Sequence, residues 1–329
     1  MPTNQTKITR RRTVAGLGAA LGFPAILEAG AQTAWPNKPV KLIMPYAPGG
    51  GGDTVARPWA EKLTQAFGVP FVVDNRGGAS GTIGAEAGAR ATPDGTTFLI
   101  TPNSALNVVP QLRKVGYDAR KDLMPVARVG DIVGGFAIVQ SLGIKNMAEL
   151  ISYAKQHPGQ IAYGSAGLGT STQLRIETLK LRAGIDILHV PYRGSADALV
   201  DLLAGSVQMM NEIVVYPHVK AGKLNLLAIN NPTRHWEFPD VPTMTEAGFP
   251  NSDVPIWFSI WAPLGTSKEI VEVFNRKVVE ISKTPEMVAR LREISFTPAI
   301  ATPDELTAFF DRDWQANAAV IREARITLS

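Results

Sequence analysis

The chain has 329 residues, of which 45% are hydrophobic and 19% are charged, as in a globular protein with a large core. It contains no cysteine, which excludes disulfides, thiol catalysis and thiolate metal sites. The formal net charge is +4, but Lys7, Arg10, Arg11, Arg12 and Glu28 give residues 1–31 a charge of +3. The remainder therefore carries about +1 and has no basic run that would favour nucleic acid.

The N-terminal segment has the organisation of a signal peptide. A basic region at Lys7–Arg12 precedes an apolar stretch at Val14–Leu27, and small residues follow at Ala29-Gly30-Ala31. The apolar stretch has roughly 14 residues, whereas a membrane-spanning helix needs about 20. We therefore expect export to the periplasm and cleavage near Ala31; the paired arginines leave both the general and the twin-arginine routes open.

The first part of the mature sequence alternates apolar runs with helical patterns. Strands are predicted at Val40–Met44, Phe71–Val73 and Thr97–Ile100. Helices are predicted at Thr54–Phe67 and Thr82–Arg90, each after a glycine-rich turn. The third strand ends in the polar loop Pro102-Asn103-Ser104, and ligands of open α/β sheets commonly bind at such ends.

The same alternation continues to the end of the chain. Further strands are predicted at Phe136–Val139, Ile161–Tyr163, Ile187–Tyr192, Val207–Met210, Leu224–Ile229 and Trp257–Ala262. Further helices are predicted at Met147–Gln156, Thr172–Ala183, Ser195–Ala204, Pro217–Ala221, Lys268–Ser282, Glu286–Glu293 and Pro303–Arg325. This order predicts an α/β fold with mostly parallel sheets.

Two of the turns share one organisation, in which an apolar strand leads through glycines into a helix. They are Tyr46–Asp53 and Gly164–Ser171. A helix start presents unpaired backbone N–H groups and a partial positive charge, and glycine lets an anion approach them. Two such turns over a hundred residues apart favour two lobes that close on a small carboxylate.

Six motifs in chain order carry a resemblance to a known family. They are Tyr46-Ala47-Pro48-Gly49-Gly50 with Asp53 and Arg57, Val73–Arg76 with Gly78–Gly81, Tyr163–Ser171, Val190–Gly194, Pro217–Leu224 and Val241–Gly248. The mature chain is similar over essentially its whole length to the tripartite tricarboxylate transporter substrate-binding proteins, the Bug family of TctC-like receptors.

The resemblance implies a two-lobed fold of the type II periplasmic binding protein kind, with a ligand cleft between the lobes. After the signal peptide at 1–31, lobe 1 would comprise 32–130 and 227–329, and lobe 2 would comprise 131–226. The implied function is capture of a small carboxylate, a di- or tricarboxylate or an aromatic acid, for delivery to a membrane permease. The implied receptor is a monomer without catalytic residues, metal or other cofactor.

The candidate ligand contacts come from the turns and from the loops near them. They are Tyr46, Gly49, Gly50, Asp53, Asn103, Ser104, Ser165, Gly169, Thr170, Ser171, Tyr192, Arg193 and Glu212. Both turns offer N–H groups or hydroxyls, with helix capping as the alternative, and Asp53 is expected to cap its helix. Arg193 offers a guanidinium fork or is a solvated surface residue. Trp257 and Trp261 are expected in the core.

One departure from the family concerns the residue expected to contact the end of the ligand opposite its bound carboxylate. Many relatives carry an aspartate where this chain reads Asn211-Glu212. If Glu212 takes that role, a ligand amine is possible; otherwise an uncharged tail is favoured.

Two other function classes remain as alternatives. A hydrolase elbow is absent, because Tyr163 stands two residues before Ser165, and the four histidines lack metal-ligand spacing, so an enzyme is the remote alternative. A sensor that docks on a membrane signalling protein would have the same fold, and the sequence does not separate it from a transport receptor.

Overall fold

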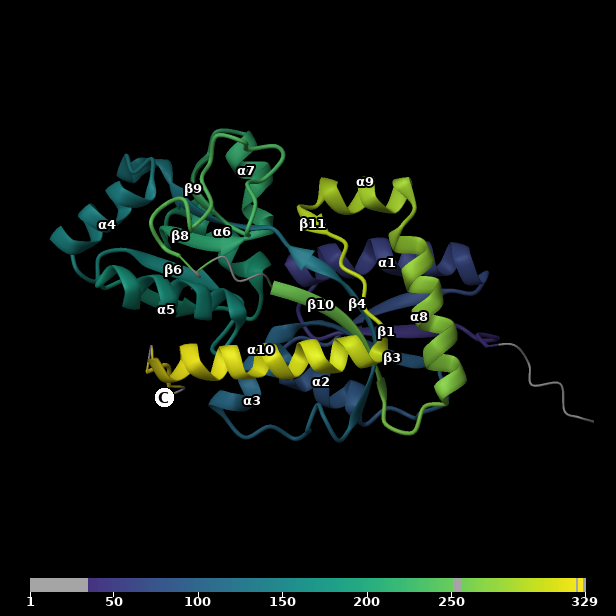
Figure 1. Ribbon diagram of the computed structural model, residues 1–329. Helices are drawn as coiled ribbons and strands as arrows, with labels where there is room; N and C mark the ends of the chain where they lie inside the picture. The colour runs from purple at the N-terminus through teal and green to yellow at the C-terminus, as the bar shows by residue number, and fades with distance from the viewer. Residues whose placement is uncertain (1–34, 251, 253–255, 324, 328–329) are drawn as a thin grey trace, which may run out of the picture. The chain divides into compact units, whose positions relative to one another are not determined.

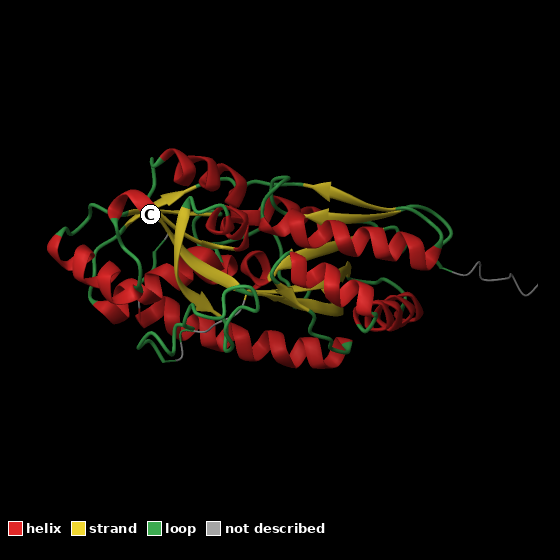
Figure 2. Ribbon diagram, turned by 90° about the horizontal axis from the view of Figure 1, so that it is seen from above, coloured by secondary structure: helices red, strands yellow, loops and turns green. Residues whose placement is uncertain are grey.

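Two mixed β-sheets organise the residues that the computed structural model describes, which are 35–250, 252, 256–323 and 325–327 (Figure 1). The signal-peptide prediction for residues 1–31 lies outside the described residues. Helices flank the strands of both sheets (Figure 2). Within the described part of the chain, every helix is too short or too polar to cross a membrane.

The first sheet has the strand order β11-β4-β10-β3-β1-β2. Its strands are β1 (Val40–Met44), β2 (Phe71–Asn75), β3 (Thr97–Pro102), β4 (Leu123–Ile132), β10 (Ile256–Pro263) and β11 (Phe296–Thr297). The α-helices that accompany it are α1 (Gly51–Phe67), α2 (Thr82–Ala89), α3 (Val109–Leu112), α8 (Lys268–Ser282), α9 (Pro285–Glu293) and α10 (Pro303–Glu323). Short helical turns occur at η1 (Ala79–Gly81) and η2 (Ser104–Val108), so the polar loop predicted after β3 begins a helical segment instead.

The second sheet has the strand order β7-β6-β8-β5-β9. Its strands are β5 (Gly134–Val139), β6 (Ala162–Ser165), β7 (Leu188–Pro191), β8 (Met209–Glu212) and β9 (Leu224–Asn230). Its helices are α4 (Met147–Gln156), α5 (Ser171–Ala183), α6 (Ser195–Ala204) and α7 (Tyr216–Lys220), with short turns at η3 (Gln140–Leu142) and η4 (Ile213–Val215).

The prediction of mostly parallel sheets was wrong, because both sheets combine parallel and antiparallel pairs. Strand β10 comes from the last third of the chain and inserts between β3 and β4, antiparallel to both. In the second sheet, β5 pairs antiparallel with β8 and β9. The sequence alternation identifies strands and helices, but it does not show that a distant strand joins a sheet in the opposite direction.

The chain passes between the sheets at two places. Strand β4 ends at Ile132 and β5 begins at Gly134, so the first crossing is at Val133. The second crossing lies between β9 of the second sheet and β10 of the first. Strand β9 belongs to the second sheet along its whole length, and Ile229 also bridges Thr243. Because the expected boundary between residues 226 and 227 would divide a strand, we propose that lobe 2 extends to Phe249, which packs in the same core cluster as β9.

Helix α10 connects the two lobes along one side of the molecule. It contacts β4 of the first sheet and α5 beside the second, and Figure 1 shows it running below α5. A small buried cluster of Val108, Leu174 and Ile326 lies at this contact. The C-terminal part of the chain therefore supports both lobes rather than only the first.

Candidate functional site

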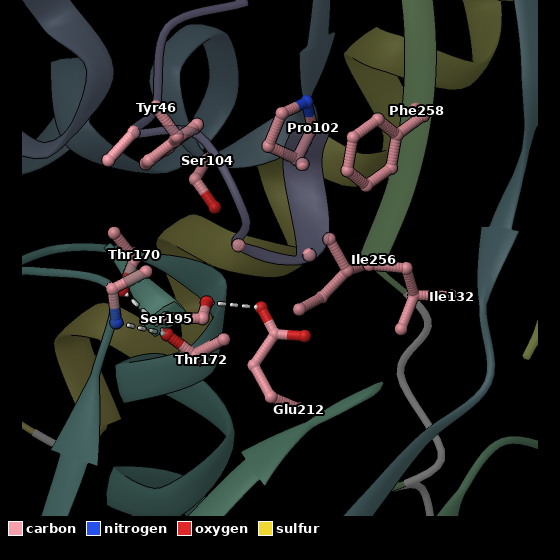
Figure 3. A pocket seen from close by; sticks show the side chains of 15 residues that line it. Tyr46, Pro102, Ser104, Ile132, Thr170, Thr172, Ser195, Glu212, Ile256 and Phe258 are labelled. Carbon is pink, nitrogen blue, oxygen red and sulfur yellow. Dashed lines mark hydrogen bonds between the residues drawn. The ribbon is translucent and has the colours of Figure 1, made fainter. Parts of the chain in front are cut away.

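A cavity lies where the two lobes meet, and Figure 3 shows the side chains around it. The first lobe contributes Tyr46, Ser104 and the backbone of Gly50–Gly52, and the second contributes Thr170, Thr172, Ser195 and Glu212. Ile132, Ile256 and Phe258 form an apolar wall. The volume is about 30 Å³. Ligand pockets usually have at least about 300 Å³, so this cavity is smaller than a usual ligand site.

Three helices begin at this cavity. Their N-cap residues are Gly50 for α1, Thr170 for α5 and Gly194 for α6, and none of the three makes a side-chain capping bond. The first-turn N–H groups of an α-helix have no partner within the helix and carry partial positive charge. Helix starts of this kind are neutral groups that can stabilise an anion.

Hydrogen bonds join the two lobes beside the cavity. The Ser171 N–H group of α5 donates to Ser104 Oγ at 2.9 Å, and Ser104 Oγ donates to Ser171 Oγ at 2.9 Å. Ser171 Oγ in turn donates to Asn103 Oδ1 at 3.0 Å. Asn103 Nδ2 donates to Asp313 Oδ2 of α10 at 3.3 Å, and Trp257 Nε1 donates to the same oxygen at 2.9 Å. We call Ser104, Ser171, Asn103 and Asp313 the interlobe network.

Glu212 carries a carboxylate into the cavity from the end of β8. Its Oε1 accepts from Ser195 Oγ at 2.7 Å, and its Oε2 accepts from the Ile213 N–H group at 2.8 Å. Burial raises the pKa of Glu212, and the bonds from Ser195 and Ile213 together with the charge of Arg175 partly oppose that rise. Arg175 is itself buried, which lowers its pKa to about 10, and its Nη1 donates to Asn211 Oδ1 at 3.0 Å.

Five of the residues predicted from sequence line the cavity. They are Tyr46, Gly50, Ser104, Thr170 and Glu212. Burial raises the pKa of Tyr46, whose hydroxyl donates to the Ser80 carbonyl at 3.2 Å. Their role in binding stays a prediction, but the structure brings all five together at one position between the lobes.

The capping role expected for Asp53 was wrong. Helix α1 begins at Gly51, three residues earlier than predicted, so Gly50 is the N-cap and Asp53 lies in the first turn. Asp53 Oδ2 accepts from the Gly49 N–H group at 2.9 Å and from Arg57 Nε at 2.8 Å. Burial would raise the pKa of Asp53, but these bonds lower it below its usual value. Asp53 therefore stabilises the turn before α1 through its hydrogen bonds to Gly49 and Arg57.

The other predicted residues lie around the cavity without lining it. Ser171 and Asn103 belong to the interlobe network. Ser165 Oγ lies 2.6 Å from His189 Nε2, and the Gly169 N–H group donates to Gln173 Oε1 at 2.6 Å. Tyr192 donates to Asp201 Oδ2 at 2.6 Å, and Arg193 is exposed to solvent. Gly49 lies beside the cavity, at the edge of a neighbouring groove.

Sequence reasoning missed the contribution of α6. Ser195 follows Gly194 at the end of the motif Val190–Gly194, which also leads from a strand through glycine into a helix. The signal was therefore present, but only two of the three turns were interpreted as anion sites.

Trp257 and Trp261 are buried, which confirms their expected place in the core.

Comparison with known proteins places this geometry in a family. A family model described as "Tripartite tricarboxylate transporter family receptor" matches residues 55–326. Protein BugT of Bordetella pertussis is 35% identical over 319 residues, which cover 95% of this chain and 97% of BugT. A Pseudomonas protein from the tcbD-tcbE intergenic region is 33% identical and covers 97% of this chain and 96% of its own.

Solved structures give the same result. An R. palustris protein solved with adipate has a TM-score of 0.86 at 33% identity, and the match covers 89% of this chain and 99% of that one. The periplasmic binding protein BugD has a TM-score of 0.85 at 30% identity, with 89% and 99% covered. MatC of Rhodopseudomonas palustris, solved with malate, has a TM-score of 0.81 at 28% identity, with 87% and 100% covered. These matches confirm the two-lobed α/β fold, and the chain belongs to the tripartite tricarboxylate transporter receptor family, whose members are periplasmic solute-binding receptors.

Proposed function

We propose that this protein is a periplasmic receptor that captures a small carboxylate and delivers it to a membrane permease of the tripartite tricarboxylate type. One observation carries the proposal: three helices whose N-cap residues make no side-chain capping bond begin at a single cavity between two lobes. Such helix starts hold a carboxylate without a salt bridge. The relatives solved with adipate and with malate support carboxylate as the ligand class.

The remaining parts of the proposal follow from the sequence and the family. The leader at residues 1–31 would direct export and be cleaved near Ala31, which leaves a mature protein from Gln32. We propose that the mature protein is a monomer, that it binds no nucleic acid and that it performs no chemistry on its ligand. Closure of the lobes on the ligand would present one conformation to the permease.

A thermal-shift screen of the mature protein against small carboxylates tests the function. The screen contains aliphatic diacids, citrate, aromatic acids and acidic amino acids, each paired with its amide. A ligand at 100 times its Kd stabilises the folded protein by about 2.7 kcal/mol, a shift of roughly 2–4 °C per kcal/mol in a protein of this size. A shift lost on amidation supports the proposal. A flat screen, after refolding to remove carried-over ligand, contradicts it.

A second measurement separates a receptor from an enzyme. The protein is incubated with each ligand that shifts its unfolding temperature, and the ligand is then recovered and measured by mass spectrometry. Quantitative recovery of unchanged ligand supports a receptor, whereas turnover contradicts it.

A further inference from the structure

Among the described residues that line the cavity, Glu212 is the one with a carboxyl side chain. Within that described set, the only other ionisable group is the phenol of Tyr46, and none is a lysine, arginine or histidine. A ligand carboxylate would therefore be held by neutral donors at the helix starts while a glutamate faces it. Figure 3 shows the Glu212 carboxylate directed into the space between the labelled residues.

The carboxylate of Glu212 reaches across from one lobe to the other. A Cβ atom on Gly51, in the first turn of α1, would lie 2.8 Å from Oε2 and 2.9 Å from Oε1. Real Cβ contacts are almost never below 3.0 Å, so only glycine at position 51 lets Glu212 lie this close to α1. Glu212 thus occupies the region next to the helix start, where a ligand anion would also be stabilised.

Two hydrogen bonds favour the ionised form of Glu212. Each of its oxygens accepts one bond, from Ser195 Oγ and from the Ile213 N–H group. Arg175 is the nearby cation that favours the charged form, and burial opposes it. Arg175 does not line the cavity, so its charge interacts with Glu212 and would not contact a ligand there.

We infer that Glu212 is a specificity-determining residue that makes the receptor prefer carboxylates with a single negative charge over dicarboxylates. This inference rests on the proposed function and narrows it. One ligand carboxylate is stabilised by the three helix starts, but a second carboxylate in the same water-excluded cavity meets the Glu212 charge. Like charges that share a buried site disfavour each other strongly.

Isothermal titration calorimetry with matched ligands tests the inference. Succinate and adipate are compared with succinamate and adipamate, in which a neutral amide of nearly the same shape replaces one carboxylate. For the chain length that fits, we expect the wild type to bind the monoamide about tenfold or more tightly than the diacid. In Glu212→Gln, we expect this ratio to fall by about tenfold, mainly because the diacid binds more tightly.

Two further variants make the test specific. Glu237→Gln removes the same charge from the second lobe at a residue that does not line the cavity, and we expect it to keep the wild-type ratio. Ser195→Ala removes one hydrogen bond that favours the charged form of Glu212, so the preference for the monoamide is expected to weaken.

The outcomes separate this inference from the proposed function. If the wild type binds diacids as tightly as monoamides, or if Glu212→Gln leaves the ratio unchanged, the role of Glu212 is overturned and the carboxylate receptor stands. The wild-type ratio alone decides the matter if Glu212→Gln does not fold. If none of the four ligands nor any acid of the wider screen binds, both proposals are overturned.

Discussion

Replacement of Ser171 by alanine would test whether contacts outside the cavity set the affinity for ligand. Ser171 does not line the cavity, but its hydroxyl connects α5 of the second lobe to Ser104 and Asn103 of the first. Both hydrogen bonds exist only while the lobes are together. We therefore expect Ser171→Ala to weaken the closed form without removing any ligand contact.

The size of the effect follows from the two bonds that are lost. A hydrogen bond contributes about 0.5–1.5 kcal/mol net, so two contribute about 2 kcal/mol. When the open form predominates in the absence of ligand, that loss appears in full in the affinity, as an increase in Kd of roughly thirtyfold. Calorimetry with the best ligand from the screen measures Kd.

The control is Ser267→Ala, at an exposed serine that precedes α8 in the first lobe. It makes the same chemical change away from the lobe contact, and we expect its Kd to equal that of the wild type. An unchanged Kd in Ser171→Ala, with an unchanged unfolding temperature, would refute the reasoning, because it would mean that the interlobe network does not stabilise the closed form.

Two further predictions concern buried charged or ionisable groups. His235 is fully buried and its pKa is lowered to about 4 by burial, so it stabilises the fold above pH 6.5 and this contribution is lost as the pH falls toward 4. Between pH 7.5 and pH 5 the free energy of unfolding should fall by about 2 kcal/mol more in the wild type than in His235→Gln, measured by urea unfolding at both pH values; equal losses would contradict this. Arg175→Met should lower the free energy of unfolding at pH 7 by about 3 kcal/mol, because it leaves Glu212 without its buried countercharge. Addition of Glu212→Gln should recover part of that loss, and strictly additive effects in the four-variant cycle would show that the two side chains are not coupled.

The sequence predicts the regular elements well where hydrophobic periodicity is strong. The predicted bounds of α4, α6 and α8 are those of the structure, because each helix has a polar face that contrasts with a buried apolar face. Strand β4 was missed because Arg128 and Asp131 interrupt its apolar pattern. These two side chains form an ion pair at 2.6 Å, and the Arg128 guanidinium lies 4.0 Å from the centre of the Phe309 ring. In the sequence, Arg128 and Asp131 therefore look like polar residues of a loop, whereas in the folded strand they pair with each other.

The parts of the candidate site that lie within one short segment of the chain could be predicted from the sequence. A glycine turn followed by a helix start is contained in about ten residues, so Gly50 and Thr170 could be found from the sequence. The interlobe network joins residues 67, 68 and 210 positions apart, and no local pattern identifies its members as partners. The sequence also did not show that Arg193 is exposed. A charged residue after a strand gives the same sequence pattern whether it faces a ligand or solvent.

The proposed use of helix starts in place of basic side chains would suit a receptor whose lobes open and close. A lysine or arginine buried in the closed cavity would lose its hydration at every closure, whereas backbone N–H groups held by α1, α5 and α6 are oriented in advance and carry only partial charge. Each lobe then provides only part of the stabilisation of an anion, and the full site exists only when the lobes meet. A ligand contacting both lobes shifts the population toward the closed form by its difference in affinity for the two forms. For this reason we expect residues of two kinds to tune binding: Glu212, which faces the ligand, and Ser171, which touches only the other lobe.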